Sequence, residues 1–226
     1  MIKENIEKVR RRIERVCARI KADPDKITIV CVTKGRPVSE ILEAVSLGLK
    51  HIGENRVQEA LLKYKELSTI DYRPSTIKWQ MVGRLQSNKV KEALKIFGLI
   101  HSVDTVSLAR EINKQAVRIN KIQDVLLEVK TSAEPGKFGF SPQNISDAYL
   151  EIKKLENIRI RGLMTIAPVV SEAQEARPYF GQLRQLRDKL NPDWLLSMGM
   201  SDDFEAAIEE GANIIRLGRA IFQDNV

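Results

Sequence analysis

The chain has 226 residues, of which 43% are hydrophobic, and a formal net charge of +7 at pH 7. This length and apolar content suffice for one large core or two small ones. No apolar run approaches the ~18 residues of a membrane span, and nothing resembles a secretory signal. We therefore expect a cytoplasmic protein with no membrane partner.

The positive charge favours an anionic ligand but does not indicate nucleic acid. Basic residues are spread among nearly as many acidic ones, only the run at residues 10–12 is dense, and aromatic residues make up just 5% of the chain. Cys17, Cys31, His51 and His101 show no metal-ligand spacing. We expect reduced structural thiols, core or rim histidines with hydrogen-bond partners, and no metal site.

The N-terminal segment is predicted to form a helix over residues 2–21. Its apolar residues recur at spacings of four and three, at Ile2, Ile6, Val9, Ile13, Val16 and Ile20. This spacing gives one narrow apolar stripe on a helix. The stripe is shorter than three heptads, so we expect residues 1–22 to pack across the body of the domain, and we favour a monomer over a dimer.

Strand and helix patterns then alternate along the chain. The predicted strands are 27–32, 50–53, 78–82, 99–103, 125–129, 158–166, 194–198 and 214–217. The predicted helices are 38–47, 57–67, 88–96, 105–120, 145–154, a long one within 171–190, and a last one opened by Asp202 and Asp203 and closed by Gly211. We expect a capping box at residues 55–58 and an N-cap at Asp104. An irregular loop is predicted from Ser132 to Pro142.

Eight strand–helix units in a chain of this length predict an α/β fold, namely a single (β/α)8 TIM barrel with an extra N-terminal helix. Residues 1–226 then form one domain. An open doubly wound sheet is the alternative.

Lys34 follows the first predicted strand, whose β-branched apolar run is typical of a strand buried on both faces. If burial and nearby cations lower the pKa of the amine from about 10.4 toward roughly 7 to 8, it becomes a nucleophile for a carbonyl. A lysine that simply points into solvent is the other explanation of this stretch.

Polar residues and glycines gather where the predicted strands end, which is where barrels carry their sites. The loops after strands seven and eight form the recurring phosphate site of such barrels. Ser201 can donate a hydroxyl there, Gly218 allows close backbone approach, and Arg219 adds positive charge. A phosphate site opposite a strand-end lysine suits pyridoxal phosphate held as an imine. The pattern alone indicates only a lysine and an anion site, so an unrelated phosphorylated metabolite is an open alternative.

Six motifs carry a family resemblance over Ile27 to Phe222. They are VCVTKGRP, HIGENRVQEAL, WQMVGRLQSNKVK, IHSVD, RGLMTI and LSMGMSDDFEAAIEEGANIIRLGRAIF. In this order they resemble the pyridoxal phosphate homeostasis proteins, whose fold is similar to the barrel domain of alanine racemase. The chain departs from the usual family pattern at Thr33, Gly35, Arg84 and Arg219.

The resemblance implies pyridoxal 5'-phosphate as the cofactor and Lys34 as its Schiff-base lysine. It places Asn55 near the ring hydroxyl, Arg216 against the pyridine nitrogen and Met198 at the cofactor, with Ser201, Gly218 and Arg219 around the phosphate. The implied role is intracellular cofactor homeostasis without substantial catalysis, with pyridoxal phosphate-dependent apoenzymes as candidate partners.

A racemase or decarboxylase that uses the same cofactor is the alternative function. It needs a second acid–base group on the opposite face of the ring. In the racemases that group is a tyrosine from a C-terminal domain, and only nine residues follow the last predicted strand here. The four tyrosines, at positions 64, 72, 149 and 179, are predicted in helices or in a loop away from the strand ends, with Tyr72 the best candidate for donation to a partner protomer.

Overall fold

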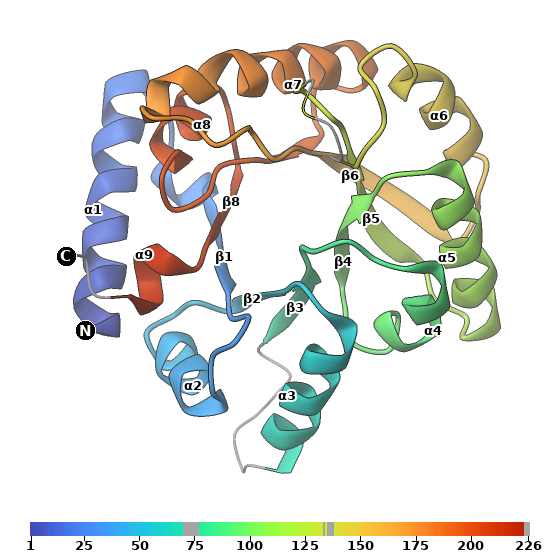
Figure 1. Cartoon of the computed structure of the whole chain (residues 1–226), viewed down its shortest axis with the longest axis horizontal. Helices are drawn as coiled ribbons and strands as arrows, with labels where there is room; N and C mark the ends of the chain where they lie inside the picture. Colours follow the sequence, from blue (N-terminus) through green and yellow to red (C-terminus); the bar gives the residue numbers. More distant parts are fainter. Residues whose placement is uncertain (70–76, 133, 135–137, 224–226) are drawn as a thin grey trace.

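The structure, a computed structural model, describes residues 1–69, 77–132, 134 and 138–223. In this part of the chain, eight parallel strands form a closed barrel in sequence order (Figure 1). The strands are β1 Thr28–Val32, β2 His51–Glu54, β3 Lys78–Met81, β4 Leu99–Val103, β5 Gln123–Glu128, β6 Ile158–Met164, β7 Leu195–Ser197 and β8 Ile214–Leu217. Because β8 pairs with β1, the barrel prediction is confirmed and the open sheet is excluded.

The barrel interior is a packed core. Val30, Leu126, Met164 and Ile214 are buried together in one cluster, separate from the larger cluster shared by strands and helices. At Gly53 an added Cβ would lie 2.7 Å from Val30 Cγ1, so a larger residue there would have no room. Both faces of the strands are therefore buried, as the apolar run of the first strand predicts.

Helices surround the barrel and alternate with the strands. They are α1 Ile2–Ile20, α2 Val38–Ser46, α3 Val57–Thr69, α4 Val90–Ala93, α5 Val106–Arg118, α6 Ile145–Ile152, α7 Arg177–Leu190, α8 Phe204–Glu209 and α9 Arg219–Phe222. Short 3-10 turns lie at Pro24–Lys26, Ser87–Lys89 and Ala173–Ala176.

The first helix packs against α8 and α9, as predicted for a helix that crosses the body of the domain. Its stripe is buried from Ile2 to Val16, but Ile20 is exposed because the helix ends there and Lys21 takes a left-handed conformation. Asn5 Nδ2 donates to the Ile221 and Gln223 carbonyls, at 3.1 and 3.0 Å. The N-terminal helix thus holds the end of the described chain against the barrel.

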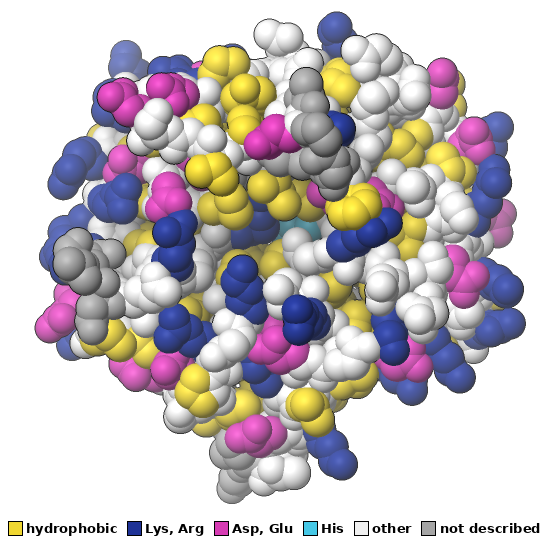
Figure 2. All heavy atoms as spheres, viewed as in Figure 1, with side chains coloured by type: hydrophobic (Ala, Val, Ile, Leu, Met, Phe, Trp, Pro, Cys, Tyr) yellow, Lys and Arg dark blue, Asp and Glu magenta, His cyan; other side chains and the backbone are white. Residues whose placement is uncertain are grey.

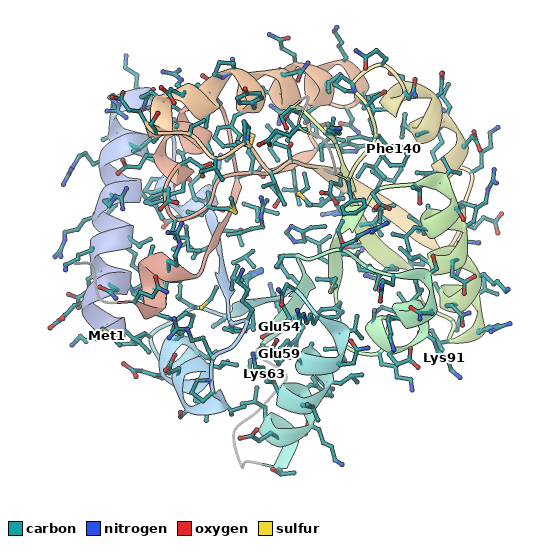
Figure 3. All side chains as sticks on the ribbon, in the orientation of Figure 1. Met1, Glu54, Glu59, Lys63, Lys91 and Phe140 are labelled. Atoms are coloured by element: carbon teal, nitrogen blue, oxygen red, sulfur yellow. The ribbon has the colours of Figure 1, made fainter. Side chains whose placement is uncertain are left out.

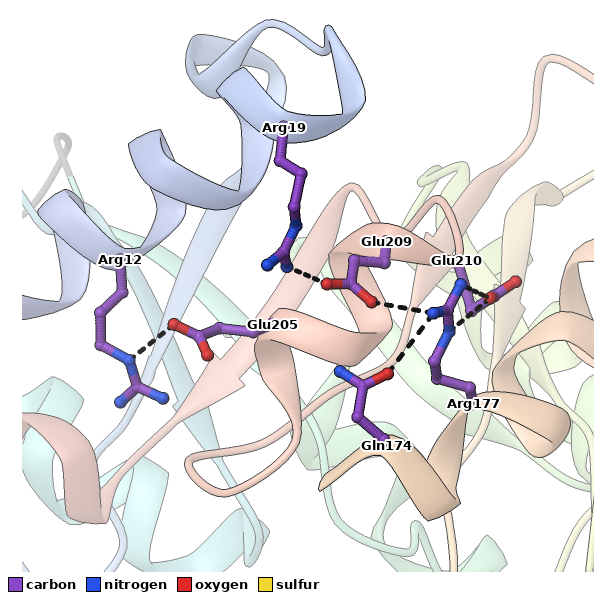
Figure 4. Close-up of polar contacts among 7 residues, drawn as sticks. All are labelled: Arg12, Arg19, Gln174, Arg177, Glu205, Glu209 and Glu210. Carbon is purple, nitrogen blue, oxygen red and sulfur yellow. Dashed lines mark hydrogen bonds and ion pairs between the residues drawn. The ribbon is translucent and has the colours of Figure 1, made fainter. Parts of the chain in front are cut away.

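Ion pairs fix α8 from two sides (Figure 4). From α1, Arg12 Nε lies 2.9 Å from Glu205 Oε1, and Arg19 pairs with Glu209. From α7, Arg177 reaches Glu209 at 3.2 Å and Glu210 at 2.7 Å. These contacts anchor the helix that follows the β7 loop, and so help to fix the loop that carries Ser201.

Three local predictions are wrong. The helix expected over 88–96 is a 3-10 turn followed by α4 alone, because the chain returns to the sheet when Gly98 N donates to the Trp79 carbonyl at 2.9 Å. Asp104 does not cap α5. The cap is Thr105, whose Oγ1 accepts from Leu108 N at 3.2 Å, while the Asp104 carboxylate lies 3.6 Å from Arg84 Nε.

The third error concerns the capping box before α3. The helix begins at Val57, close to the predicted start, but Asn55 Oδ1 is buried and accepts no hydrogen bond within the described part of the chain. Residues 171–190 do hold the long helix expected there, since α7 follows the 3-10 turn at Ala173–Ala176.

Candidate functional site

The carboxyl ends of the strands surround a hollow at the centre of one face (Figure 2). Lys and Arg side chains stand around this hollow, and apolar side chains and a histidine show at its floor. Because the barrel closes β8 onto β1, the loops after β7, β8, β1 and β2 are neighbours there. The structure thus brings Lys34, Asn55, Ser201 and Gly218 to the same end of the barrel.

Lys34 lies in a tight turn directly above β1. Arg36 N donates to the Thr33 carbonyl at 3.0 Å, and Gly35 has φ +69°, the left-handed conformation that glycine adopts at the third position of a type II turn. Thr33 is completely buried, whereas Lys34 is exposed. Of the two explanations left open for this stretch, the structure supports a lysine exposed to solvent, because the turn lifts this residue out of the strand. Among the described residues, its ammonium makes no hydrogen bond or ion pair.

The loops after β7 and β8 are joined to each other. Ser201 Oγ accepts a hydrogen bond from Ala220 N at 3.1 Å, which leaves the hydroxyl proton available for an anion. Gly218 packs closely on β1, since an added Cβ would lie 3.3 Å from the Val32 carbonyl oxygen. The Arg219 side chain turns outward and pairs with Asp202. The Met198 side chain is fully buried in the core cluster that strands and helices share.

Arg216 is buried inside the barrel, beneath these loops. Its Nη1 donates to Ser197 Oγ at 2.7 Å, and its Nη2 donates to the Thr165 carbonyl at 2.9 Å. Burial lowers the pKa of Arg216 to about 10, while the Asp203 and Glu128 carboxylates act in the opposite direction. The guanidinium therefore keeps its charge at neutral pH.

A chain of hydrogen bonds crosses the barrel interior below Arg216. His101 Nδ1 lies 2.9 Å from Ser197 Oγ, His101 Nε2 lies 2.7 Å from Gln80 Oε1, and Gln80 Nε2 lies 2.6 Å from His51 Nδ1. Arg216 can only donate, so Ser197 Oγ accepts from it and can donate its own hydrogen to His101 Nδ1. The ring hydrogen of neutral His101 is therefore assigned to Nε2, which donates to the Gln80 oxygen. Burial, followed by the charge of Arg216, holds the pKa of His101 well below its ordinary value, so the ring is neutral.

These interior residues confirm that the two histidines are core or rim groups with partners. Gln80 and Ser197 were missed at the sequence level. The signal that could have found them is the alternation of inward and outward side chains along each strand, because Gln80 and His101 occupy inward positions of β3 and β4.

Asn55 follows β2 and packs against the turn after β3. An added Cβ at Gly83 would lie 2.4 Å from the Asn55 carbonyl oxygen, so only glycine fits there. Asn55 Oδ1 is buried and has no partner within the described ranges, so it is an acceptor that suits a hydroxyl donor on a ligand. Nearby, the Arg84 guanidinium carbon lies 3.4 Å from the centre of the Phe138 ring.

The tyrosines that the structure describes are engaged elsewhere. Tyr64 packs edge-on against Trp79, with ring centres 6.2 Å apart, and Tyr149 packs edge-on against Trp194 at 5.1 Å. Tyr179 is half-buried against the core cluster of strands and helices. Tyr72 lies outside the described residues, as do residues 133 and 135–137 of the loop predicted from Ser132 to Pro142.

Within the described part of the chain, no helix is long and apolar enough to cross a membrane. No group of three or more His, Cys, Asp or Glu side chains in that part could hold a metal ion. Cys17 and Cys31 are buried free thiols, as predicted.

The fold and the site define the class of protein. The family model described as "Alanine racemase, N-terminal domain" matches residues 1–226. An alanine racemase of Clostridium difficile 630 shares this fold, with a TM-score of 0.73 at 16% identity over 99% of this chain and 56% of that one. The chain is thus a barrel of the alanine racemase N-terminal domain class.

Relatives of higher sequence identity show which family within this class the chain belongs to. A pyridoxal phosphate homeostasis protein of Aquifex aeolicus is 42% identical, over 97% of this chain and 96% of that protein. The structure of PipY from Synechococcus elongatus with PLP bound has a TM-score of 0.84 at 34% identity, over 98% of this chain and 100% of that one. The chain belongs to the pyridoxal phosphate homeostasis protein family.

Proposed function

We propose that this protein binds pyridoxal 5'-phosphate at the barrel mouth and holds it reversibly through a Schiff base on Lys34. The observation that carries the proposal is an exposed lysine on a fixed turn, with no partner among the residues that the structure describes, next to the joined loops after β7 and β8. The name of the Aquifex relative and the PLP-bound PipY structure support it.

The described residues fit this cofactor. When bound, it supplies an aldehyde that condenses with a primary amine and releases water. Lys34 provides the amine, and the unpaired Asn55 Oδ1 suits the ring hydroxyl. Ser201 and the backbone beside Gly218 suit the phosphate. The side chain of Arg219 is paired with Asp202, so this residue contributes through its charge and backbone rather than through a hydroxyl.

Arg216 is proposed to face the pyridine nitrogen. A fixed positive charge disfavours a second cation beside it, so the nitrogen stays unprotonated and the ring is a poor electron sink. Met198 supports the β7 loop from the core side.

We propose that the protein has no substantial racemase or decarboxylase activity. Racemisation requires a second acid–base group opposite the lysine. Tyr64 and Tyr149 pack instead against Trp79 and Trp194, which belong to the core cluster shared by strands and helices. The role is then cofactor homeostasis by a cytoplasmic, single-domain monomer, with pyridoxal phosphate-dependent apoenzymes as candidate partners.

An absorbance spectrum of the purified protein with pyridoxal phosphate tests the proposal, followed by borohydride reduction and peptide mapping. The expected result is a visible imine band that reduction fixes on Lys34. No band at all would favour an unrelated phosphorylated ligand, and a band fixed on another lysine would show that Lys34 is not the nucleophile.

A further inference from the structure

Three charged residues lie together where β2 and α3 meet, namely Glu54, Glu59 and Lys63 (Figure 3). The side chain of Lys63 is only 9% exposed, although lysine is among the residues least often buried. Its ammonium lies 2.6 Å from the Thr33 carbonyl oxygen, 2.7 Å from Glu54 Oε1 and 2.6 Å from Glu59 Oε1. All three of its N–H groups are therefore used.

These contacts act on both sides of Lys34. Lys63 binds the carbonyl of Thr33, and the Thr33 hydroxyl donates to Glu54 Oε1 at 2.6 Å. On the other side, Gly35 N donates to Glu59 Oε1 at 2.6 Å. The backbone before and after Lys34 is thus fixed, while the Lys34 side chain itself stays exposed.

We propose that Lys63, acting with Glu59, is the positioning residue that aims the Lys34 amine at the cofactor aldehyde. This inference rests on the proposed function. A short turn with a left-handed glycine has little packing of its own, since no atom of the described residues lies within 4 Å of a Cβ added at Gly35. The ion-paired cluster supplies the order that the turn lacks, and a fixed nucleophile lowers the entropic cost of reaching the reacting geometry.

The covalent step needs no other reactant. The Lys34 ammonium first gives one proton to solvent. The neutral nitrogen then attacks the aldehyde carbon, the C=N bond replaces the C=O bond, and the carbonyl oxygen leaves as water with the two hydrogens that the amine loses. No oxidant or reductant is involved, so the protein controls this step only through geometry and charge.

The charges in the cluster depend on Lys63. Glu54 and Glu59 both point at its ammonium, and Glu54 Oε2 is buried with no hydrogen-bond partner among the described residues. Burial raises the pKa of Glu54, whereas the hydrogen bonds from Lys63 and Gly35 help to lower the pKa of Glu59. Without Lys63, two carboxylates would face each other, and the Gly35 amide would lose a fixed acceptor.

The test compares Lys63→Met and Glu59→Ala with Lys65→Met, which removes an exposed lysine from the same helix. Amide hydrogen exchange at Gly35 is measured in the cofactor-free proteins, together with the thermal midpoint. We expect Gly35 exchange to rise about tenfold or more in the first two variants and to stay unchanged in Lys65→Met. Glu59→Gln keeps an acceptor for Gly35 and is expected to restore slow exchange.

Cofactor addition gives the second readout. The pyridoxal phosphate concentration needed to form half of the borohydride-fixed adduct on Lys34 is expected to rise about tenfold or more in Lys63→Met and Glu59→Ala. It should return toward the wild-type value in Glu59→Gln. Wild-type adduct formation in a variant with fast Gly35 exchange would overturn the positioning role.

The outcomes separate the two proposals. If the wild-type protein forms no adduct on Lys34, the proposed function fails, whatever the variants do. If Lys63→Met does not fold, Glu59→Ala and Glu59→Gln decide the question, because Glu59 is partly exposed at the first turn of α3. Equal adduct formation in those two variants would then refute the inference.

Discussion

Glu128, at the end of β5, gives a quantitative test of the barrel electrostatics. It is 9% exposed, and its pKa is raised from 4.5 to about 7, mainly by burial and then by the Asp104 charge, against the opposing charges of Arg216 and Arg84. The folded protein therefore holds a proton on Glu128 at pH values where the unfolded chain has lost it. As pH rises from about 4.5 to about 7, this group lowers the stability of the fold.

The size of the effect follows from the change in pKa. One pKa unit corresponds to about 1.4 kcal/mol. The change from 4.5 to about 7 therefore lowers the free energy of unfolding by about 3 kcal/mol once the pH is well above 7. Glu128→Gln keeps the shape and removes the charge. Since Arg216 loses a neighbouring carboxylate, we expect a net gain of about 1–3 kcal/mol in unfolding free energy near pH 8.5 and almost none near pH 4.

Urea denaturation of the cofactor-free protein measures this difference. Wild type and Glu128→Gln are compared at about pH 4, 6 and 8.5, with Glu156→Gln as an exposed control that is expected to change stability little at any of them. Other titrating groups largely cancel in the difference between wild type and variant. A difference between wild type and Glu128→Gln that is constant over this range would refute the assignment of a buried, protonated carboxyl.

Further predictions concern the site. Lys34→Ala should leave the thermal midpoint nearly unchanged, because the residue is exposed, and should abolish the borohydride-fixed adduct; a full adduct on one defined lysine would contradict this. Arg216→Glu should stabilise the protonated ring and change the bound cofactor's spectrum, and an unchanged spectrum at normal occupancy would argue against its placement. Gly83→Ala should lower the free energy of unfolding by about 1–3 kcal/mol and weaken cofactor binding, since its Cβ would overlap the Asn55 backbone. Urea denaturation measures the first effect, and titration with pyridoxal phosphate measures the second. Polarimetry of the loaded protein across common amino acids should show no turnover above free cofactor, and robust turnover lost on mutation of a tyrosine would refute the non-enzymatic proposal.

The sequence by itself determined the elements and their order. The spacing of apolar residues predicts α1 and the strands, because a helix that packs on the barrel buries one face and a barrel strand buries both. It also placed Lys34 after the first strand and Ser201 and Gly218 after the last two, which the closed barrel then brings to one end.

Only the tertiary structure decided how side chains pair between elements. Lys34 is exposed because a turn held by residues of β2 and α3 lifts it, and no local pattern contains those contacts. Thr105 caps α5 because Asp104 faces Arg84 from another loop.

The interior chain from Arg216 to His51 draws its members from strands that are far apart in sequence. Residue type shows that such polar groups need partners once they are buried, but which ones meet depends on strand register and on the closure of β8 against β1. The spacing of residues along the sequence is a local property, and it determines neither the strand register nor the closure of the barrel.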